Sequence, residues 1–130
     1  MYSKTTNDIT VTVEPTYLEA QSAPEDNQYL WAYQIRIENR GHSTVQLRNR
    51  TWHITDSAGR TQVVQGEGVI GEQPVLAPGD WFGYVSGTPL TTPSGLMHGS
   101  YGMVDGAGEP FEVDVPAFSL DSPYTRRTLN

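Results

Sequence analysis

The sequence predicts an all-β fold, an antiparallel β-sandwich of about seven to eight strands. Three observations predict it. Apolar and polar residues alternate along most segments, which is the period of a half-buried strand. Turn residues such as Asp-Gly and Pro-Gly interrupt these segments about every 8–12 residues. No segment shows the 3.6-residue apolar period of a helix. Together they indicate a sandwich of the immunoglobulin or fibronectin type III-like class.

The first two strands are expected at residues 9–13 and 28–39. In residues 9–13, β-branched apolar residues alternate with threonines, and Pro15 is expected to end the strand. The second segment gives the strongest signal, because large apolar side chains occupy one face along its length. That face carries Tyr29, Trp31, Tyr33, Ile35 and Ile37. A turn at residues 39–42 follows.

A change of phase marks the next strand. Apolar residues stand at odd positions over residues 45–47 and at even positions over residues 52–54. One extra residue near residues 49–51 reconciles the two phases, which is the signature of a β-bulge. With this phase, Trp52 faces the core and His53 faces away.

Later segments follow the same rule. Residues 56–59 predict a turn, because an acceptor opens it and a glycine closes it, and residues 61–64 return as a partner strand. Three further strands are expected, each after a turn rich in glycine or proline, at residues 81–86, 96–104 and 111–115. We expect one domain over residues 1–125 and a flexible tail over residues 126–130.

Composition argues against several classes of function. The 15 acidic and 8 basic residues give a net charge of −7, so nucleic acid is not an expected partner. No apolar run approaches the roughly 18–20 residues of a membrane span, and the first residues lack the apolar core of a signal peptide. We therefore expect a cytoplasmic protein without membrane contact. Because cysteine is absent, no disulfide, thiolate metal site or cysteine nucleophile is available.

The most conspicuous motif is a G-x-G-x-x-G at residues 66–71, formed by Gly66, Gly68 and Gly71. In a dinucleotide-binding fold, such glycines let the backbone approach a pyrophosphate at a helix N-terminus. Here Pro74 follows too soon for that helix, and two glutamates flank the loop with negative charge. A glycine-permitted loop between strands is the favoured interpretation, and a ligand-binding loop is the alternative.

No set of catalytic or metal-binding residues is recognisable. Ser86 lacks the G-x-S-x-G frame of a nucleophile elbow, and no histidine stands beside a serine by spacing. The histidines are far apart in sequence, although sandwich strands can bring distant residues together: His42, His53 and His98. The acidic turns carry too few carboxylates for a Mg²⁺ or Ca²⁺ cage. We therefore expect no enzyme activity, no metal ligand and no cofactor.

Two groups of residues are candidates for binding a protein partner. If the strand over residues 28–39 lies near a sheet edge, its free backbone groups and its rings can hold an added strand: Tyr29, Trp31 and Tyr33. The arginines of residues 36–60 can form a positive patch that selects an acidic segment: Arg36, Arg40, Arg48, Arg50 and Arg60. The alternatives are core rings and exposed ion pairs. The same edge would also allow a homodimer.

Several segments taken together resemble the bacterial ApaG family. The resemblance spans about residues 2–120, and Trp31 departs from it because the family often has phenylalanine there. The segments that carry it are residues 17–24 (YLEAQSAP), 31–33 (WAY), 45–47 (VQL), 52–56 (WHITD), 66–74 (GEGVIGEQP), 76–79 (LAPG), 84–90 (YVSGTPL), 97–101 (MHGSY) and 111–113 (FEV).

The resemblance implies a fibronectin type III-like sandwich and a family without an established enzymatic activity. ApaG-like domains within eukaryotic proteins, such as F-box proteins and a polymerase-interacting protein, look like interaction modules. Bacterial members are associated with cobalt tolerance and magnesium efflux. We therefore expect a non-enzymatic module for an unidentified protein partner. The alternatives are a small-ligand or divalent-cation (Mg²⁺ or Co²⁺) sensor linked to metal homeostasis, or pyrophosphate or nucleotide binding at residues 66–71.

Overall fold

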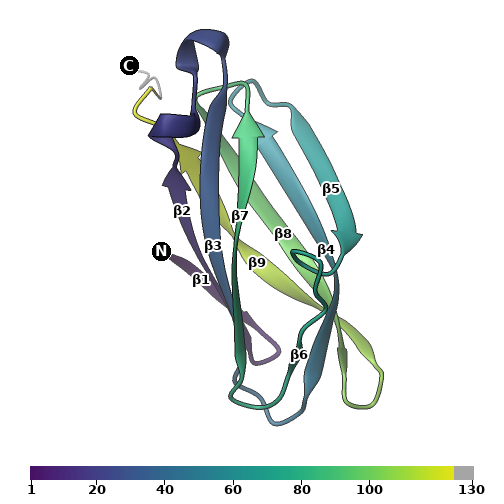
Figure 1. The fold of residues 1–130 in the computed structure, drawn as a ribbon. Helices are drawn as coiled ribbons and strands as arrows, with labels where there is room; N and C mark the ends of the chain where they lie inside the picture. Colours follow the sequence, from purple (N-terminus) through teal and green to yellow (C-terminus); the bar gives the residue numbers. More distant parts are fainter. Residues whose placement is uncertain (125–130) are drawn as a thin grey trace, which may run out of the picture.

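The computed structural model describes residues 1–124, which form two antiparallel β-sheets packed face to face (Figure 1). The first sheet has the order β1-β2-β3-β7, with β1 (Tyr2–Thr6), β2 (Ile9–Tyr17), β3 (Tyr29–Asn39) and β7 (Trp81–Leu90). The second has the order β5-β4-β8-β9, with β6 paired to β4. Its strands are β4 (Val45–Asp56), β5 (Thr61–Glu67), β6 (Val75–Leu76), β8 (Ser94–Asp105) and β9 (Pro110–Asp121).

This architecture confirms the predicted sandwich, with nine strands in the described residues where seven to eight were expected. The helices of residues 1–124 are two three-residue 3-10 turns, η1 (Glu19–Gln21) and η2 (Pro24–Asp26). Neither is long enough to cross a membrane. The tail expected over residues 126–130 lies outside the described residues.

Strand β3 shows why alternation builds this core. Its predicted apolar face is buried along the whole strand, while Gln34 and Arg36 face solvent. Asn39 continues the buried face at the end of the strand. Its side-chain amide donates to the carbonyl oxygens of Ser43 and Leu76, so this buried polar group is satisfied.

The predicted change of phase in β4 is confirmed. The register with β8 shifts between Leu47 and Asn49, so Arg48 is the extra residue of the bulge, just before the expected position. After the bulge, Trp52 is buried and His53 points to the outer face of the second sheet.

At the N-terminus one prediction was wrong and one strand was missed. Strand β2 does not stop at Pro15 but continues to Tyr17, paired with β3. Its other neighbour, β1, pairs with it only as far as Val13. Beyond that point one side of β2 is an edge, where the missing N–H of proline costs no ladder bond. Strand β1 itself was not predicted, since its residues do not alternate. Its hairpin turn is formed by Asn7 and Asp8, both at positive φ (48° and 64°), as type I′ turns require.

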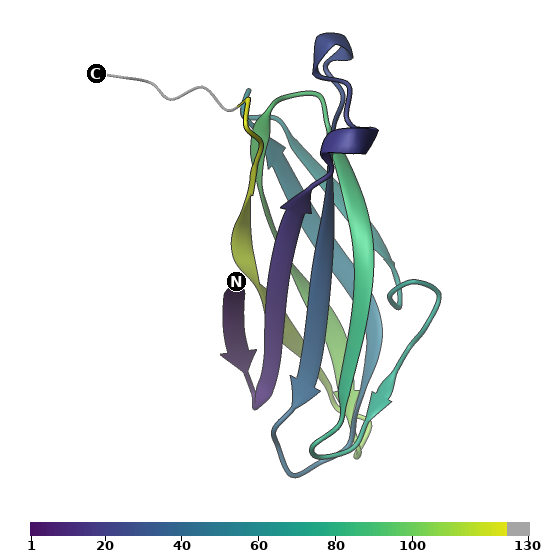
Figure 2. The ribbon, with the colours of Figure 1, turned by 60° about the vertical axis from the view of Figure 1, so that its left-hand side comes forward.

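The two sides of the sandwich differ. On one side β1 and β2 lie in front of β9 (Figure 2), and hydrogen bonds join the sheets, as from the Ser119 amide to the Tyr2 hydroxyl. On the other side, β7 ends the first sheet and β5 ends the second. One side is therefore bridged by contacts between the two sheets, and the other presents the edges of β7 and β5.

Candidate functional site

The candidate site is the open side of the sandwich, between β7 and β5 (Figure 1). Within residues 1–124, each of these strands has a strand partner on one side only. The backbone N–H and C=O groups of an unpaired edge can accept an added strand. Strand β7 offers the longer edge, with ten residues against seven in β5.

The outer face of β7 carries two large apolar side chains in solvent. Trp81 is 56% exposed and Val85 is 59% exposed, and they point to the same side of the strand. Gly83 lies between them and leaves room for the indole, because a Cβ at Gly83 would come 3.1 Å from the Trp81 ring. The Arg36 guanidinium lies 4.3 Å from the centre of that ring, which is a cation–π contact. The edge strand therefore displays an ordered apolar platform.

A cavity of about 510 Å³ opens at the C-terminal end of β7. It is lined from both sheets, and its apolar wall includes Tyr29, Ile54 and Leu90, which are among the least buried residues of the core at 7–9% exposure. The volume lies within the range of small-ligand sites. It can therefore take an apolar side chain of a partner or a small molecule.

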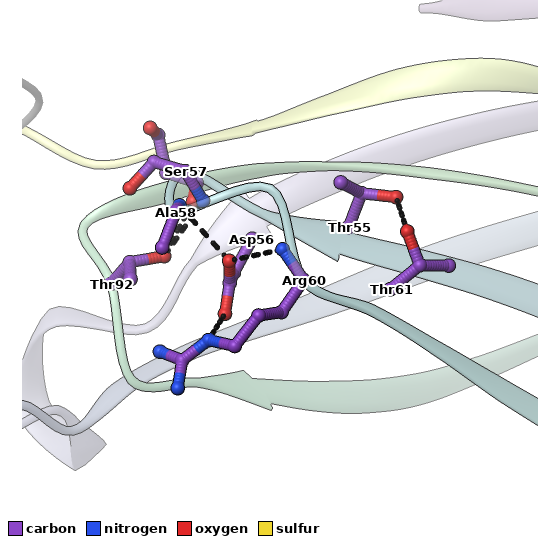
Figure 3. A network of polar contacts seen from close by, with 8 residues as sticks. Thr55, Asp56, Ser57, Ala58, Arg60, Thr61 and Thr92 are labelled. Atoms are coloured by element: carbon purple, nitrogen blue, oxygen red, sulfur yellow. Dashed lines mark hydrogen bonds and ion pairs between the residues drawn. The ribbon is translucent and has the colours of Figure 1, made fainter.

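The turn between β4 and β5 gives this cavity an ordered polar rim (Figure 3). One Asp56 carboxylate oxygen accepts the backbone N–H groups of Ala58 and Arg60, and the other accepts Arg60 Nε at 3.2 Å. These hydrogen bonds hold the pKa of Asp56 below its usual value, and the bond from the Arg60 amide has the largest effect. Next to it, the hydroxyls of Thr55 and Thr61 lie 2.9 Å apart.

The aromatic residues predicted as surface anchors are core residues. Tyr29, Trp31 and Tyr33 are buried, and their strand β3 is interior, between β2 and β7. The Trp31 indole N–H donates to the carbonyl of Asp121 across the two sheets, at 3.0 Å. The condition that this strand lies near an edge is not met, and the alternative that its rings belong to the core holds, because alternation assigns a face and not a position in the sheet. Only Tyr29 reaches the candidate site, as part of the cavity wall.

The arginines do not form a single patch, and the alternative of ion pairs with nearby acids holds for Arg36, Arg40 and Arg60. Arg36 lies on the outer face of the first sheet, near Glu38, and Arg40 Nε bonds the same carboxylate at 2.9 Å. Arg48 is exposed at the bulge of the second sheet, and Arg50 turns toward the space between the sheets. Of these, only Arg36 contacts the apolar platform of β7, through the Trp81 ring.

Arg50 is engaged by the glycine-rich loop. Its Nη1 donates to the carbonyl oxygens of Glu67 and Gly68, and its guanidinium packs over Gly66. The loop therefore turns carbonyl oxygens, not N–H groups, toward this cation. Arg50 was predicted as a partner contact, but these bonds hold it inside the loop.

The rest of the loop follows the same pattern. Gly68 N–H donates to the Arg48 carbonyl, and Val69 and Glu72 exchange two backbone hydrogen bonds. Val69 is 1% exposed and anchors the loop in the core. The strand β6, not a helix, comes next in the chain. Gly66, Gly68 and Gly71 thus stand in a turn whose amides at Gly68, Val69 and Glu72 are already used, which favours a glycine-permitted loop over a phosphate cradle.

The inner face of β7 contributes to a buried tyrosine cluster. The hydroxyls of Tyr84 and Tyr101 lie 2.6 Å apart and link the two sheets. Burial raises the pKa of Tyr33, Tyr84 and Tyr101, and the nearby Arg50 charge opposes this rise only in part. The cluster holds neutral hydroxyls beneath the open side.

Sequence reasoning missed Trp81 and Val85 as surface residues. A signal was present: large apolar residues stand on both faces of residues 81–86, with Phe82 and Tyr84 on the opposite parity. One face fills the core, so the other has to remain exposed or meet a partner.

Comparisons with known proteins identify the family. A model of the ApaG domain matches residues 19–105. Protein ApaG of Rhodospirillum centenum is 62% identical over 130 residues, and that of Paramagnetospirillum magneticum is 59% identical, both over the full length of each chain. The crystal structure of the putative ApaA protein from Bordetella pertussis aligns with a TM-score of 0.87 at 49% identity, covering 91% of this chain and 96% of that chain. An X-ray structure of structural genomics target SoR45 aligns with a TM-score of 0.85 at 44% identity, covering 95% and 94%. This chain belongs to the ApaG domain family.

Proposed function

We propose that this chain is a non-enzymatic protein-binding module. An extended segment of a partner adds to the free edge of β7 and places an apolar side chain in the adjoining cavity. The observation that carries this proposal is the edge itself: β7 is unpaired on one side within the described residues and exposes Trp81 and Val85. It carries two apolar side chains where protected edge strands carry charges.

Strand addition suits the components of this site. Backbone hydrogen bonds along β7 give affinity, and side-chain contacts give specificity. Tryptophan and arginine are the residue types enriched at binding hot spots, and the Arg36–Trp81 contact presents both in one ordered unit. The cavity at the end of the strand supplies a place for an anchor residue.

A photo-crosslinking experiment tests the proposal. A benzophenone amino acid at position 85 is expected to crosslink a protein partner in cells, whereas the same probe at position 96, on the interior strand β8, is not. Leu96 is a fair control, because it is also an exposed apolar residue, at 45%. A probe at position 85 that captures no protein beyond those captured at position 96 would contradict a β7 site.

Lysine substitutions then test the edge with purified partner. Val85→Lys places a charge on β7 and is expected to weaken binding at least tenfold. Val75→Lys is the matched control, because Val75 has the same 59% exposure on the short strand β6. Val63→Lys reports on the β5 edge. Equal effects of the three changes would show that β7 has no special role, and loss only with Val63→Lys would move the site to β5.

A further inference from the structure

Two histidines meet on the outer face of the second sheet. His53 on β4 and His98 on β8 are directly opposite in the antiparallel register. Their rings are stacked, with centroids 4.7 Å apart and planes 8° from parallel. Within residues 1–124, neither imidazole forms a hydrogen bond or an ion pair. Their ring nitrogens are therefore free for a ligand.

We propose that His53 and His98 form a two-ligand site for a late first-row divalent ion, of the class of Zn²⁺, Ni²⁺ and Cu²⁺. Neutral imidazole is a preferred ligand of these ions, whereas Mg²⁺ and Ca²⁺ prefer oxygen. Two nitrogens at about 2.0–2.1 Å from one tetrahedral ion lie roughly 3.3 Å apart. Cross-strand residues of an antiparallel pair have Cβ atoms only about 4.5–5.5 Å apart, so binding requires the two stacked rings to rotate until one nitrogen of each lies within this span.

The surroundings suit such a site. His98 is exposed and His53 is half-buried, so an ion can reach both. The residue opposite His53 on β5 is Val63, which carries no charge. The nearest acid by register is Asp114 on β9, opposite Ser100, and it is held by Lys4 at 3.1 Å. The two histidines are then the protein ligands, and water or a partner's side chain completes the coordination.

Titration of the intact chain, prepared without a polyhistidine tag, tests the site. With Zn²⁺ and Ni²⁺ as probes, calorimetry is expected to give one ion per chain, and His53→Asn or His98→Asn should each weaken binding at least tenfold. His42→Asn is the matched control, because His42 lies in the exposed turn between β3 and β4. A hundredfold excess of Mg²⁺ should leave Zn²⁺ binding unchanged.

A second measurement separates binding at the pair from unfolding of a variant. Paramagnetic Ni²⁺ should broaden the ring NMR signals of His53 and His98 in the wild type and leave those of His42 sharp. Bound metal should also raise the melting temperature of the wild type but not of the two variants, because it joins β4 to β8 only in the folded state. Absence of binding at millimolar Zn²⁺, binding that survives His53→Asn in a folded variant, or competition by Mg²⁺ would each overturn the site.

Discussion

At the scale of single residues, Gly68 and Gly71 differ in what a side chain would cost. At Gly71 the cost is backbone strain alone, and at Gly68 it is backbone strain and a steric clash. Both have positive φ, 63° and 79°, but a Cβ on Gly68 would collide with the carbonyl oxygen of Glu72, whereas a Cβ on Gly71 would meet nothing within 4 Å. Gly71→Ala is expected to cost about 1–2 kcal/mol for the left-handed backbone. Gly68→Ala adds a packing clash of about 1–3 kcal/mol. Urea denaturation of both variants measures the difference, and equal midpoints would contradict it.

Trp52 and His53 are neighbours on opposite faces of one strand. Trp52 is 4% exposed, and its ring meets those of Tyr33, Tyr101 and Phe118 at centroid distances of 5.5–6.3 Å. Trp52→Ala should therefore cost about 3–5 kcal/mol, as for a buried large aromatic residue. His53→Ala should cost less than about 1 kcal/mol, since its half-buried ring lies on the outer face of the sheet and not in the core. Chemical denaturation checks both, and similar losses would refute the phase assigned after the bulge.

At the scale of elements, two hairpin turns have the same hydrogen-bonding pattern. Residues 56–60 and 105–109 both open with an aspartate whose carboxylate accepts two backbone N–H groups, and both have a glycine at positive φ in the fourth position. They differ at the fifth position, where Arg60 pairs with Asp56 and Glu109 stands in the other turn. The two turns therefore differ chiefly in the ion pair between Arg60 and Asp56.

Folding lowers the pKa of Asp56 below its value of about 4 in the unfolded chain. The charged Asp56 therefore stabilises the fold at pH values above about 4, and this contribution is lost as the pH falls through the folded pKa. Asp56→Asn keeps an acceptor oxygen but removes the charge, so it should be less stable than the wild type at pH 7 and equally stable near pH 2. Asp105→Asn is the control and should lose less at pH 7. Melting curves at both pH values measure this, and a constant difference would contradict the assignment.

The strands that were predicted well are those whose fold is encoded locally. In β3 and β4, alternation and one phase change are enough to assign every face, because burial of one side dictates them. The extension of β2 past Pro15 was missed, since it depends on where a distant strand stops pairing. The position of β3 inside its sheet depends on β7, which lies more than 40 residues later in the chain. For this reason the sequence could not show that Tyr29, Trp31 and Tyr33 lie in the core and not at an edge.

At the scale of the whole molecule, the sandwich is joined differently along its two sides. The β1–β9 side is held by surface contacts such as the Lys4–Asp114 ion pair. Toward the open side, the link is internal, through the hydroxyls of Tyr84 and Tyr101. The open edge of β7 therefore lies directly over a polar contact between the sheets. This arrangement joins the inner face of β7 to the second sheet, while Trp81 and Val85 stay exposed on its outer face.

The hydroxyl pair predicts a coupling that spans the two sheets. Tyr84→Phe leaves the buried Tyr101 hydroxyl without its partner and should cost about 1–3 kcal/mol, as should the reverse change. The double variant leaves no orphan, so its cost should fall below the sum of the single costs by about 0.5–3 kcal/mol. Urea denaturation of the wild type, the two single variants and the double variant completes this double-mutant cycle. Additive losses of stability would show that the two hydroxyls act independently.

The same pair predicts a loss of stability in alkali. Burial raises the pKa of Tyr84 and Tyr101 above the unfolded value of about 10, so the folded state retains protons that the unfolded chain releases. Their contribution is complete below pH 10 and declines as the pH rises toward the folded values. The free energy of unfolding should therefore drop between about pH 10 and pH 12 in the wild type, and drop less in the double phenylalanine variant. Equal slopes in the two proteins would assign the alkaline transition to other groups.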